Sequence, residues 1–393
     1  MSTAAADREL LFGATALALR PRVLALGDTG VPAEERTVRI SVQPRGLSER
    51  ARESLTGLDE VRFAPGLGTS DGESAILTCP RPLLAAAAEV SEEGRVMLEA
   101  VLSVERPAAP PRLMGVVNVT PDSFSDGGRW LEPARAVEHG LRLEAEGAAL
   151  LDVGGESTRP GAQPVSERVE LERVLAVVEG LAEHARIPIS IDTTKASVAR
   201  ACLEAGATIV NDVSAGRADP QMLPLIAERG CGFIAMHMRG EPRSMQRAPR
   251  YSDPVEEVCE FLRDRLAACL QAGAELRRMT LDPGIGFGKR LRHNLELLRR
   301  LPELRSLGRP LCVGVSRKSF IAHATGELSP EDWEGNRPTG TRDRLAGGAA
   351  AICACVLGGA EILRVHDVAQ MAEATAVAVG VSRGAGPTDS NED

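Results

Sequence analysis

Residues 187–212, IPISIDTTKASVARACLEAGATIVND, contain the pattern that decides the fold. Two short aliphatic runs, at 187–192 and 207–212, enclose a segment near 195–205 whose apolar spacing is typical of a helix. Strands joined through a helix run parallel, and strands with few polar interruptions are typical of a sheet covered on both faces. The stretch therefore predicts a strand–helix–strand unit of a parallel sheet.

The same alternation extends through most of the chain. Helical patterns near 133–147 and 165–184 separate further aliphatic runs, which read LMGVVNV, LLDVGG, GFIAMHM, MTLDPG, PLCVGVS and EILRVHD. With the two runs above, they make eight strand–helix units between residues 111 and 384. Eight units in this length fit a closed barrel better than an open sheet. We therefore expect an α/β fold, a (β/α)8 TIM barrel.

The chain is longer than such a barrel requires. An apolar alternation from Val38 to Val42 indicates a strand ahead of the barrel, and apolar segments follow near 74–79 and 96–104. The stretch RPAAPPR at 106–112 contains three prolines and is typical of a stiff linker. We expect an appended N-terminal α/β domain of unknown role, the barrel and a disordered tail, at residues 1–110, 111–384 and 385–393.

Composition excludes several classes of protein. Hydrophobic residues make up 43% of the chain and charged residues 26%, so a packed core is expected rather than disorder. The net charge of −9 argues against nucleic-acid binding, which requires a basic surface. Eight cysteines without a Cys-x-x-Cys pair indicate reduced thiols, as in the cytoplasm.

No segment has the character of an export signal or a membrane anchor. The apolar stretch 10–19 follows Asp7 and Glu9, where a signal peptide carries basic residues. Residues 345–360 are uncharged but fall short of the roughly 20 residues that a bilayer requires. We therefore expect a cytoplasmic protein with neither membrane nor nucleic acid as partner, and a buried helix at 345–360.

Almost every predicted strand ends in a polar or ionisable residue. In a (β/α)8 barrel the carboxyl ends of all strands meet at one mouth, where such residues form a site. The residues at these ends are Asn118, Asp152, Asp192, Asn211, His237, Asp282, Ser316 with Lys318, and Arg364 with His366. Taken singly, Asp192 also suits a helix N-cap because a helix starts after TTK, and His366 suits a structural histidine. Their common position at strand ends favours a binding site.

Seven segments at these strand ends resemble the ordered motifs of one enzyme family, dihydropteroate synthase, and the resemblance spans Pro111 to Arg383. They are NVTPDSFSDGG (118–128), DVGGESTRPG (152–161), SIDTTK (190–195), NDVSAG (211–216), DPGIGFGK (282–289), SRKSF (316–320) and RVHD (364–367). The resemblance implies a transferase of folate biosynthesis. Such an enzyme condenses 6-hydroxymethyl-7,8-dihydropterin pyrophosphate with p-aminobenzoate to give 7,8-dihydropteroate and pyrophosphate. It also implies a homodimer formed through late barrel helices, and a bound Mg²⁺.

The edge of a pterin carries N–H donors, which calls for carboxylate and amide acceptors. Asp192, Asn211 and Asp282 supply these groups. The resemblance implies that the pterin is bound by Asp152, Asp192, Asn211, Met236, Asp282, Phe287, Lys318 and Arg364. We expect Met236 to pack on the ring, and His237 to be a pocket wall rather than a zinc ligand, because no further ligand stands at zinc spacing.

A pyrophosphate requires cationic donors. Arg364 and His366 are separated by one residue, so both side chains leave the same face of their strand. The resemblance implies a pyrophosphate site that consists of Asn118, Thr158, Arg159, Arg364, Val365 and His366. It also implies that Asn118 binds the Mg²⁺ that bridges to the pyrophosphate, and a single protein ligand suits this metal.

The resemblance further implies that Phe124, Thr158, Pro160 and Ser316 frame the p-aminobenzoate pocket. The arylamine is neutral at pH 7, so we assign no general base and no nucleophilic side chain. Catalysis is expected to consist of positioning the substrates and stabilising charge. The residues expected to do so are Asp192, Lys318, Arg364 and His366.

Two nucleotide-binding motifs do not fit the segment after the predicted strand at 279–282. The string GIGFGK fails as a phosphate-binding P-loop because Pro283 and Arg290 stand where glycine and a hydroxyl residue are required, and Lys289 breaks a dinucleotide fingerprint. Two alternative functions share the expected barrel. One is a pterin-binding methyltransferase domain, which needs no pyrophosphate site. The other is a non-catalytic pterin-binding paralogue.

Overall fold

The computed structural model describes residues 21–26, 37–42, 75–90, 92–105, 109–120, 132–157, 162–241, 244–329 and 344–383. The chain forms two compact units. The N-terminal unit contains Met1–Pro107 together with Ser252–Ala267 and Arg300–Arg309, and the barrel unit contains Ala108–Tyr251, Ala268–Arg299 and Pro310–Asp393. Each unit is described by itself.

Eight parallel strands form the sheet of the barrel. They are β4 (Arg112–Asn118), β5 (Leu150–Gly154), β6 (Ile189–Asp192), β7 (Ile209–Asp212), β8 (Gly232–Met236), β9 (Met279–Asp282), β10 (Cys312–Gly314) and β11 (Ile362–Val365). The hydrogen-bonded order is β10-β11-β4-β5-β6-β7-β8-β9, and a parallel bridge between Leu281 and Leu311 joins the two ends. The predicted (β/α)8 TIM barrel is confirmed, with all eight strands at the predicted runs.

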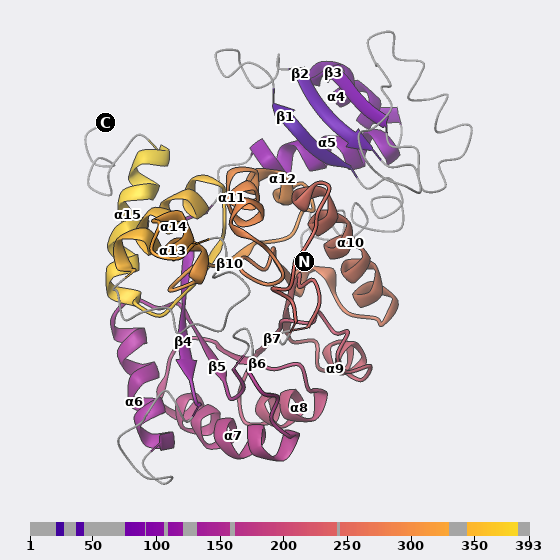
Figure 1. Ribbon diagram of the computed structural model, residues 1–393. Helices are drawn as coiled ribbons and strands as arrows, with labels where there is room; N and C mark the ends of the chain where they lie inside the picture. Colours follow the sequence, from indigo (N-terminus) through magenta and orange to yellow (C-terminus); the bar gives the residue numbers. More distant parts are fainter. Residues whose placement is uncertain are drawn as a thin grey trace, which may run out of the picture. The chain divides into compact units, whose positions relative to one another are not determined.

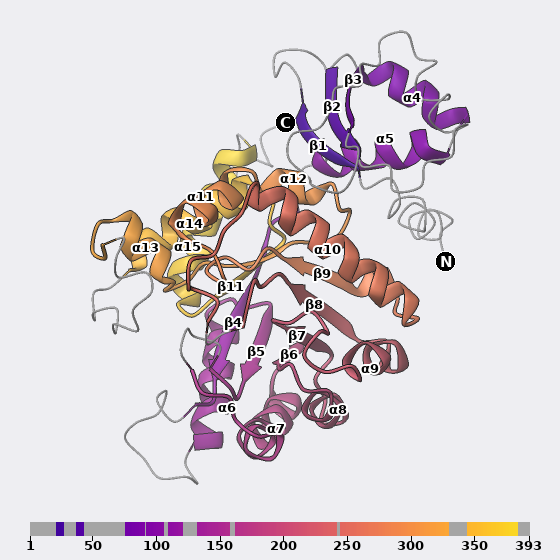
Figure 2. The same ribbon diagram turned by 45° about the vertical axis from the view of Figure 1, so that its right-hand side comes forward.

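Helices follow the strands along the chain, and those of the barrel unit surround its sheet, whereas α12 and most of α10 belong to the N-terminal unit (Figure 1, Figure 2). Their bounds are α6 (Glu132–Ala145), α7 (Glu167–His184), α8 (Ala196–Glu204), α9 (Met222–Arg229), α10 (Pro254–Gln271), α11 (Leu291–Arg299), α12 (Leu301–Arg305), α13 (Ser319–Ala324), α14 (Leu345–Leu357) and α15 (Val368–Arg383), with a 3-10 turn at Leu276–Arg278. Residues 345–357 of the uncharged segment form α14, which confirms the predicted helix, but its last residue, Leu357, is exposed rather than buried. Among the helices that the structure describes, none is long and apolar enough to cross a membrane.

The interior of the barrel is filled by side chains from strands that lie far apart in the sequence. One cluster combines Met114, Leu150, Ile234, Cys312 and Ile362, all at most 3% exposed. These residues come from five different strands, so they pack together only in the closed barrel. The filled interior leaves the carboxyl ends of the strands as the place for polar groups.

The N-terminal unit contains an antiparallel sheet in the order β1-β2-β3, formed by β1 (Arg22–Leu26), β2 (Thr37–Val42) and β3 (Ala75–Pro80). Helices α4 (Arg81–Val90) and α5 (Glu92–Glu105) follow. Val38 and Ile40 are fully buried and alternate with exposed Thr37 and Arg39, which confirms the strand predicted there.

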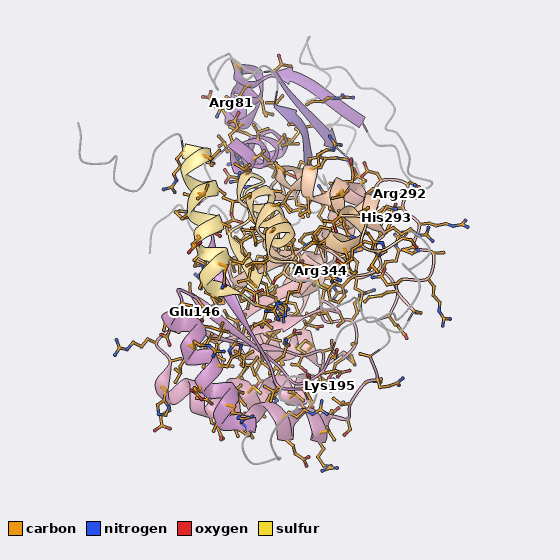
Figure 3. The ribbon with its side chains drawn as sticks, turned by 60° about the vertical axis from the view of Figure 1, so that its left-hand side comes forward. Arg81, Glu146, Lys195, Arg292, His293 and Arg344 are labelled. Carbon is orange, nitrogen blue, oxygen red and sulfur yellow. The ribbon has the colours of Figure 1, made fainter. Side chains whose placement is uncertain are left out.

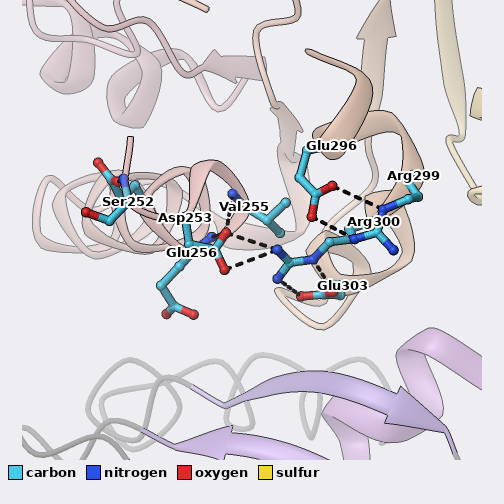
Figure 4. A network of polar contacts seen from close by, with 9 residues as sticks. Ser252, Asp253, Val255, Glu256, Glu296, Arg299, Arg300 and Glu303 are labelled. Atoms are coloured by element: carbon cyan, nitrogen blue, oxygen red, sulfur yellow. Dashed lines mark hydrogen bonds and ion pairs between the residues drawn. The ribbon is translucent and has the colours of Figure 1, made fainter. Parts of the chain in front are cut away.

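Two arginines tie helices of the N-terminal unit to the main chain of its first 107 residues. Arg263 of α10 donates a hydrogen bond of 2.7 Å to the Pro21 carbonyl, and Arg305 of α12 donates one of 2.9 Å to the Val104 carbonyl. Arg300, ahead of α12, binds Asp253 and Glu303 (Figure 4). These contacts explain why segments near 260 and 305 belong to this unit.

Candidate active site

The carboxyl ends of the strands bring the predicted residues together. The register pairs Gly154 with Asp192, and Asp192 with Asn211, on neighbouring strands. Farther around the barrel, Met236 of β8 pairs with Asp282 of β9, and Gly314 of β10 pairs with Arg364 of β11. The polar strand ends therefore surround one mouth, as the sequence indicates.

An arginine joins two carboxylates at this mouth. The Arg364 Nε donates to Asp152 Oδ2 at 2.6 Å, and its Nη2 donates to Asp192 Oδ2 at 2.8 Å. The same Asp152 oxygen accepts from Asn211 Nδ2 at 3.0 Å. Burial disfavours the charged guanidinium, but Asp152 and Asp192 outweigh this effect and raise the pKa of Arg364. We call these four residues the carboxylate cluster.

One buried acceptor atom of the carboxylate cluster has no hydrogen-bond partner within the described residues. Asp152 is fully buried, and its second oxygen, Oδ1, has no hydrogen-bond partner within the described residues. A buried acceptor without a partner costs free energy, on the order of 1–3 kcal/mol, unless a ligand satisfies it. The cluster therefore suits a bound molecule with N–H donors.

Asp192 titrates near neutral pH. Burial raises its pKa to about 7, even though Arg364 acts in the opposite direction, and Asp152 adds to the rise. The alternative that Asp192 caps helix α8 is wrong, because α8 begins at Ala196 and its N-cap residue is Lys195. Asp192 instead points at Arg364.

Asp282 and Lys318 lie at the opposite side of the mouth, on β9 and after β10. Burial raises the pKa of Asp282, opposed by Lys318, and burial lowers the pKa of Lys318 to about 8, opposed by Asp282. The Lys318 ammonium donates to the Ile285 carbonyl and stands 4.9 Å from the centre of the Phe287 ring. This side offers a cation above an aromatic face.

The turn 283–288 after β9 requires glycine at two positions. Gly284 and Gly288 have φ of +67° and +63°, which favours glycine. A Cβ at Gly284 would also overlap the His237 carbonyl oxygen, and one at Gly288 would overlap the Arg239 carbonyl oxygen. The Gly284 amide donates to Asp282 Oδ1 at 2.6 Å, so the turn fixes the Asp282 carboxylate.

An apolar wall lies between the polar groups. Met236 packs with Val213, Met238 and Met245, and Phe287 packs against this cluster. Methionine side chains adapt to flat ring surfaces and contact aromatic rings favourably. The wall therefore suits a planar heterocycle.

The remaining predicted residues lie at the ends of β4, β10 and β11. His366 Nδ1 lies 3.1 Å from Ser316 Oγ, and Val365 is fully buried. Asn118 is half-buried at the end of β4. Four predicted residues fall outside the described ranges, namely Phe124, Thr158, Arg159 and Pro160.

Two lysines near the mouth received no role from the sequence. Lys195, labelled in Figure 3, forms ion pairs with Glu156 and Glu170. Lys289, which sequence reasoning used only to reject a nucleotide motif, is fully buried and binds His237. The rarity of lysine in the sequence could have indicated the importance of Lys289, because only three lysines, 195, 289 and 318, occur among 46 basic residues.

A sequence model described as pterin binding enzyme matches residues 114–366. The dihydropteroate synthase of Mycobacterium leprae is 48% identical over 284 residues, which cover 71% of this chain and 96% of that protein. The dihydropteroate synthase of Escherichia coli K12 is 44% identical over 267 residues, covering 68% and 90%.

Solved structures give the same result. A Xanthomonas albilineans dihydropteroate synthase structure with 4-aminobenzoic acid has a TM-score of 0.61 and 45% identity, covering 71% of this chain and 94% of that one. A structure from the same organism in complex with 7,8-dihydropteroate has a TM-score of 0.59 and 42% identity, with the same coverage. The family match begins at residue 114, so the first 107 residues lie outside it.

Proposed function

Because this chain belongs to the dihydropteroate synthase family, we propose that it condenses 6-hydroxymethyl-7,8-dihydropterin pyrophosphate with p-aminobenzoate. The products are 7,8-dihydropteroate and pyrophosphate. The observation that carries this proposal is the convergence of acceptors and donors on one mouth. Asp152, Asp192 and Asn211 lie on one side of it, and Asp282 and Lys318 lie on the other.

The donors and acceptors of a pterin ring would match these groups. Its amino and ring N–H groups would donate to Asp192 and to the open Oδ1 of Asp152, with Asn211 beside them. Lys318 would donate to the ring carbonyl while Asp282 accepts from the opposite edge. Met236 and Phe287 would cover the faces of the ring.

The pyrophosphate is proposed to lie above β4 and β11. Arg364 lies on β11 and His366 directly follows its last residue, Val365, so alternation along an extended chain would direct both side chains to the same face. Thr158 and Arg159 are proposed to add donors from the loop after β5. Charge-assisted hydrogen bonds from these cations would stabilise the leaving group as negative charge develops on it.

We propose that a divalent metal binds at this mouth through Asn118. Among the described residues, no group of three or more His, Cys, Asp or Glu is placed to hold a metal ion. Mg²⁺ prefers oxygen ligands and commonly keeps several waters while it bridges substrate phosphates, so the Asn118 amide oxygen can serve as its protein ligand. When bound, Mg²⁺ would neutralise charge on the pyrophosphate.

The arylamine of p-aminobenzoate is proposed to attack the pterin methylene carbon as the C–O bond to pyrophosphate breaks. The amine is neutral and uses its own lone pair, so no side chain acts as a nucleophile. Asp192 would stabilise positive charge that develops on the pterin, and Arg364 and His366 would stabilise the departing anion.

Phe124, Thr158, Pro160 and Ser316 are proposed to frame the p-aminobenzoate pocket. Ser316 is mostly buried beside His366, close to the proposed pyrophosphate site. Phe124→Ala should raise the KM for p-aminobenzoate by about ten-fold, the usual effect of losing one aromatic contact, and leave the pterin KM unchanged. Equal increases in both would contradict this placement.

The purified full chain should convert the two substrates to 7,8-dihydropteroate, detected by chromatography. Lys318→Met should lose most of this activity, whereas the surface variant Arg200→Met, which removes an exposed ion pair with Glu228, should keep it. Binding of the pterin without product would favour the non-catalytic paralogue. Methyl transfer from a methylated pterin would favour the methyltransferase domain.

We also propose a cytoplasmic homodimer. Seven cysteines of the described residues carry free thiols, as proteins of reducing compartments do. On α15, Val377 and Val381 are 66% and 71% exposed one turn apart, and Leu357 of the adjacent α14 is 57% exposed. A second copy would cover this apolar face, and light scattering should find a dimer that Val381→Glu converts to a monomer.

A further inference from the structure

Lysine is placed selectively in this chain. Arginine supplies 43 of the 46 basic residues, and the three lysines are Lys195, Lys289 and Lys318. All three follow carboxyl ends of barrel strands, after β6, β9 and β10. Arginine and lysine carry the same charge but differ in shape. A lysine in a chain that otherwise uses arginine therefore indicates a position where a compact ammonium is required or tolerated.

The contacts of Lys289 fit an ammonium group. Lys289 is fully buried, and its Nζ donates to the Gly284 carbonyl at 2.9 Å and to the Phe287 carbonyl at 3.1 Å. It also lies 2.8 Å from His237 Nδ1. Burial, with help from Lys289, keeps the pKa of His237 well below its ordinary value, so the neutral imidazole can accept. Burial also lowers the pKa of Lys289, and the Asp282 carboxylate opposes this effect and favours the charged ammonium. Lys289 Nζ also donates to the His237 carbonyl at 3.4 Å, so four acceptors surround the three protons of the ammonium.

The turn that Lys289 holds carries the proposed pterin contacts. Gly284, whose carbonyl binds Lys289, donates its amide to Asp282 Oδ1 at 2.6 Å. Phe287, whose carbonyl also binds Lys289, places its ring 4.9 Å from the Lys318 ammonium. The Ile285 carbonyl between them accepts from Lys318. Each group on this side of the pocket is therefore attached to the same turn.

We infer that Lys289 is a positioning residue for pterin binding. It draws the carbonyls of the turn 284–288 around one buried ammonium and thereby sets the orientation of Asp282, Phe287 and Lys318. Lys289 itself does not touch the substrate. The inference rests on the proposed function, and it assigns to this lysine a task that goes beyond holding the fold.

Space excludes arginine at this position. The main chain closes around the ammonium, and buried Asn294 holds it there by donating to the Lys289 carbonyl at 3.3 Å and accepting from the Gly286 amide at 2.7 Å. A guanidinium is larger and planar, and overfilling a packed site distorts its surroundings. Lys195 differs, since its side chain is 19% exposed and binds two carboxylates, which a guanidinium also can do.

The test measures pterin binding without turnover. Calorimetry with 6-hydroxymethyl-7,8-dihydropterin, in the absence of p-aminobenzoate, gives Kd for the wild type, Lys289→Met and Lys289→Arg. Both variants should bind about ten-fold more weakly, the effect of misplacing one charge-assisted hydrogen bond. With saturating pterin substrate, the KM for p-aminobenzoate should stay within about two-fold.

Leu181→Ala is the matched control for lost stability. Leu181 is fully buried on α7, and its truncation should lower Tm without changing the pterin Kd. If Lys289→Met lowers Tm as Leu181→Ala does and binds pterin like the wild type, Lys289 is only structural and the inference is wrong. If the wild type itself binds no pterin, the proposed function fails instead.

A milder variant covers the case in which the Lys289 variants do not fold. His237→Gln keeps the main-chain acceptors and changes only the side chain at Nδ1. It should weaken pterin binding by about three-fold, less than the loss of the ammonium itself. An unchanged pterin Kd in folded His237→Gln would overturn the inference.

Discussion

The two sides of the barrel mouth hold their polar groups in different ways. On the side of β5, β6 and β11, charged side chains bind one another directly, as Arg364 does with Asp152 and Asp192. On the side of β9 and β10, the groups are held by main-chain carbonyls of the turn 284–288, which surround buried Lys289. The first side depends on charge, and the second depends on backbone shape.

This difference predicts how each side responds to change. Paired side chains can rotate and titrate, so the carboxylate cluster should respond to charge removal and to pH. The turn 284–288 contains three glycines with positive φ, Gly284, Gly286 and Gly288, so its backbone conformation does not tolerate other residues at these positions. It should therefore respond most strongly to added volume.

The largest effect is expected for Gly284→Ala. The new Cβ would overlap the His237 carbonyl oxygen at a φ of +67°, and overpacking with backbone strain costs roughly 4 kcal/mol in sum. Denaturant unfolding measures this loss. Gly230→Ala is the control, since Gly230 also has a positive φ but no atom within 4 Å of the new Cβ, and it should lose only about 1 kcal/mol. Equal losses would contradict the role of the turn.

Arg364→Met should have the next largest effect. It leaves two carboxylates without their shared cation, which should lower kcat/KM by about 100-fold, or roughly 3 kcal/mol. The control Arg317→Met removes an ion pair with Asp367 whose arginine is 61% exposed, and it should change kcat/KM by less than about three-fold. Steady-state kinetics of both variants measure this difference. A larger loss of kcat/KM in Arg317→Met than in Arg364→Met would contradict it.

The pH profile of kcat/KM should separate the two sides. As pH falls through about 7, Asp192 gains a proton and loses its charge as an acceptor, so activity falls. As pH rises through about 8, Lys318 loses its proton and activity falls again. Asp192→Asn should remove the acidic limb and leave the basic one. An unchanged acidic limb in this variant would assign that limb to another group.

The smallest effect is expected for Ser316→Ala. Its hydroxyl orients His366 through a contact of 3.1 Å, and the loss of one such hydrogen bond costs about 1 kcal/mol. The kcat/KM for the pterin substrate should therefore fall by about five-fold. A fall as large as that of Arg364→Met would show that Ser316 does more for the pterin substrate than orient His366.

Sequence pattern sufficed for the barrel because its strands are short aliphatic runs, each ending in a polar residue. It also placed Asp152, Asp192 and Asn211 at one mouth, since parallel strands end together. It did not reveal that Arg364 binds Asp152 and Asp192, because barrel closure brings β11 beside β4 across 250 residues of sequence.

The contacts of the turn after β9 could not be predicted from the sequence for another reason. Lys289 binds backbone carbonyls, which every residue possesses, so no pattern of side chains in the sequence indicates these contacts. The N-terminal unit also contains a main-chain contact that the sequence does not predict. The alternation at Val38 and Ile40 predicted a strand, but the contact of Arg263 with the Pro21 carbonyl joins residues 242 positions apart.

Pyrophosphate release by the purified full chain tests dihydropteroate synthesis at this mouth most directly. The wild type and Asp192→Ala are given 6-hydroxymethyl-7,8-dihydropterin pyrophosphate and Mg²⁺, with and without p-aminobenzoate. Release that depends on p-aminobenzoate and falls by at least about 100-fold in Asp192→Ala is the predicted result. Pterin binding by the wild type without release, or equal release by both proteins, would contradict it.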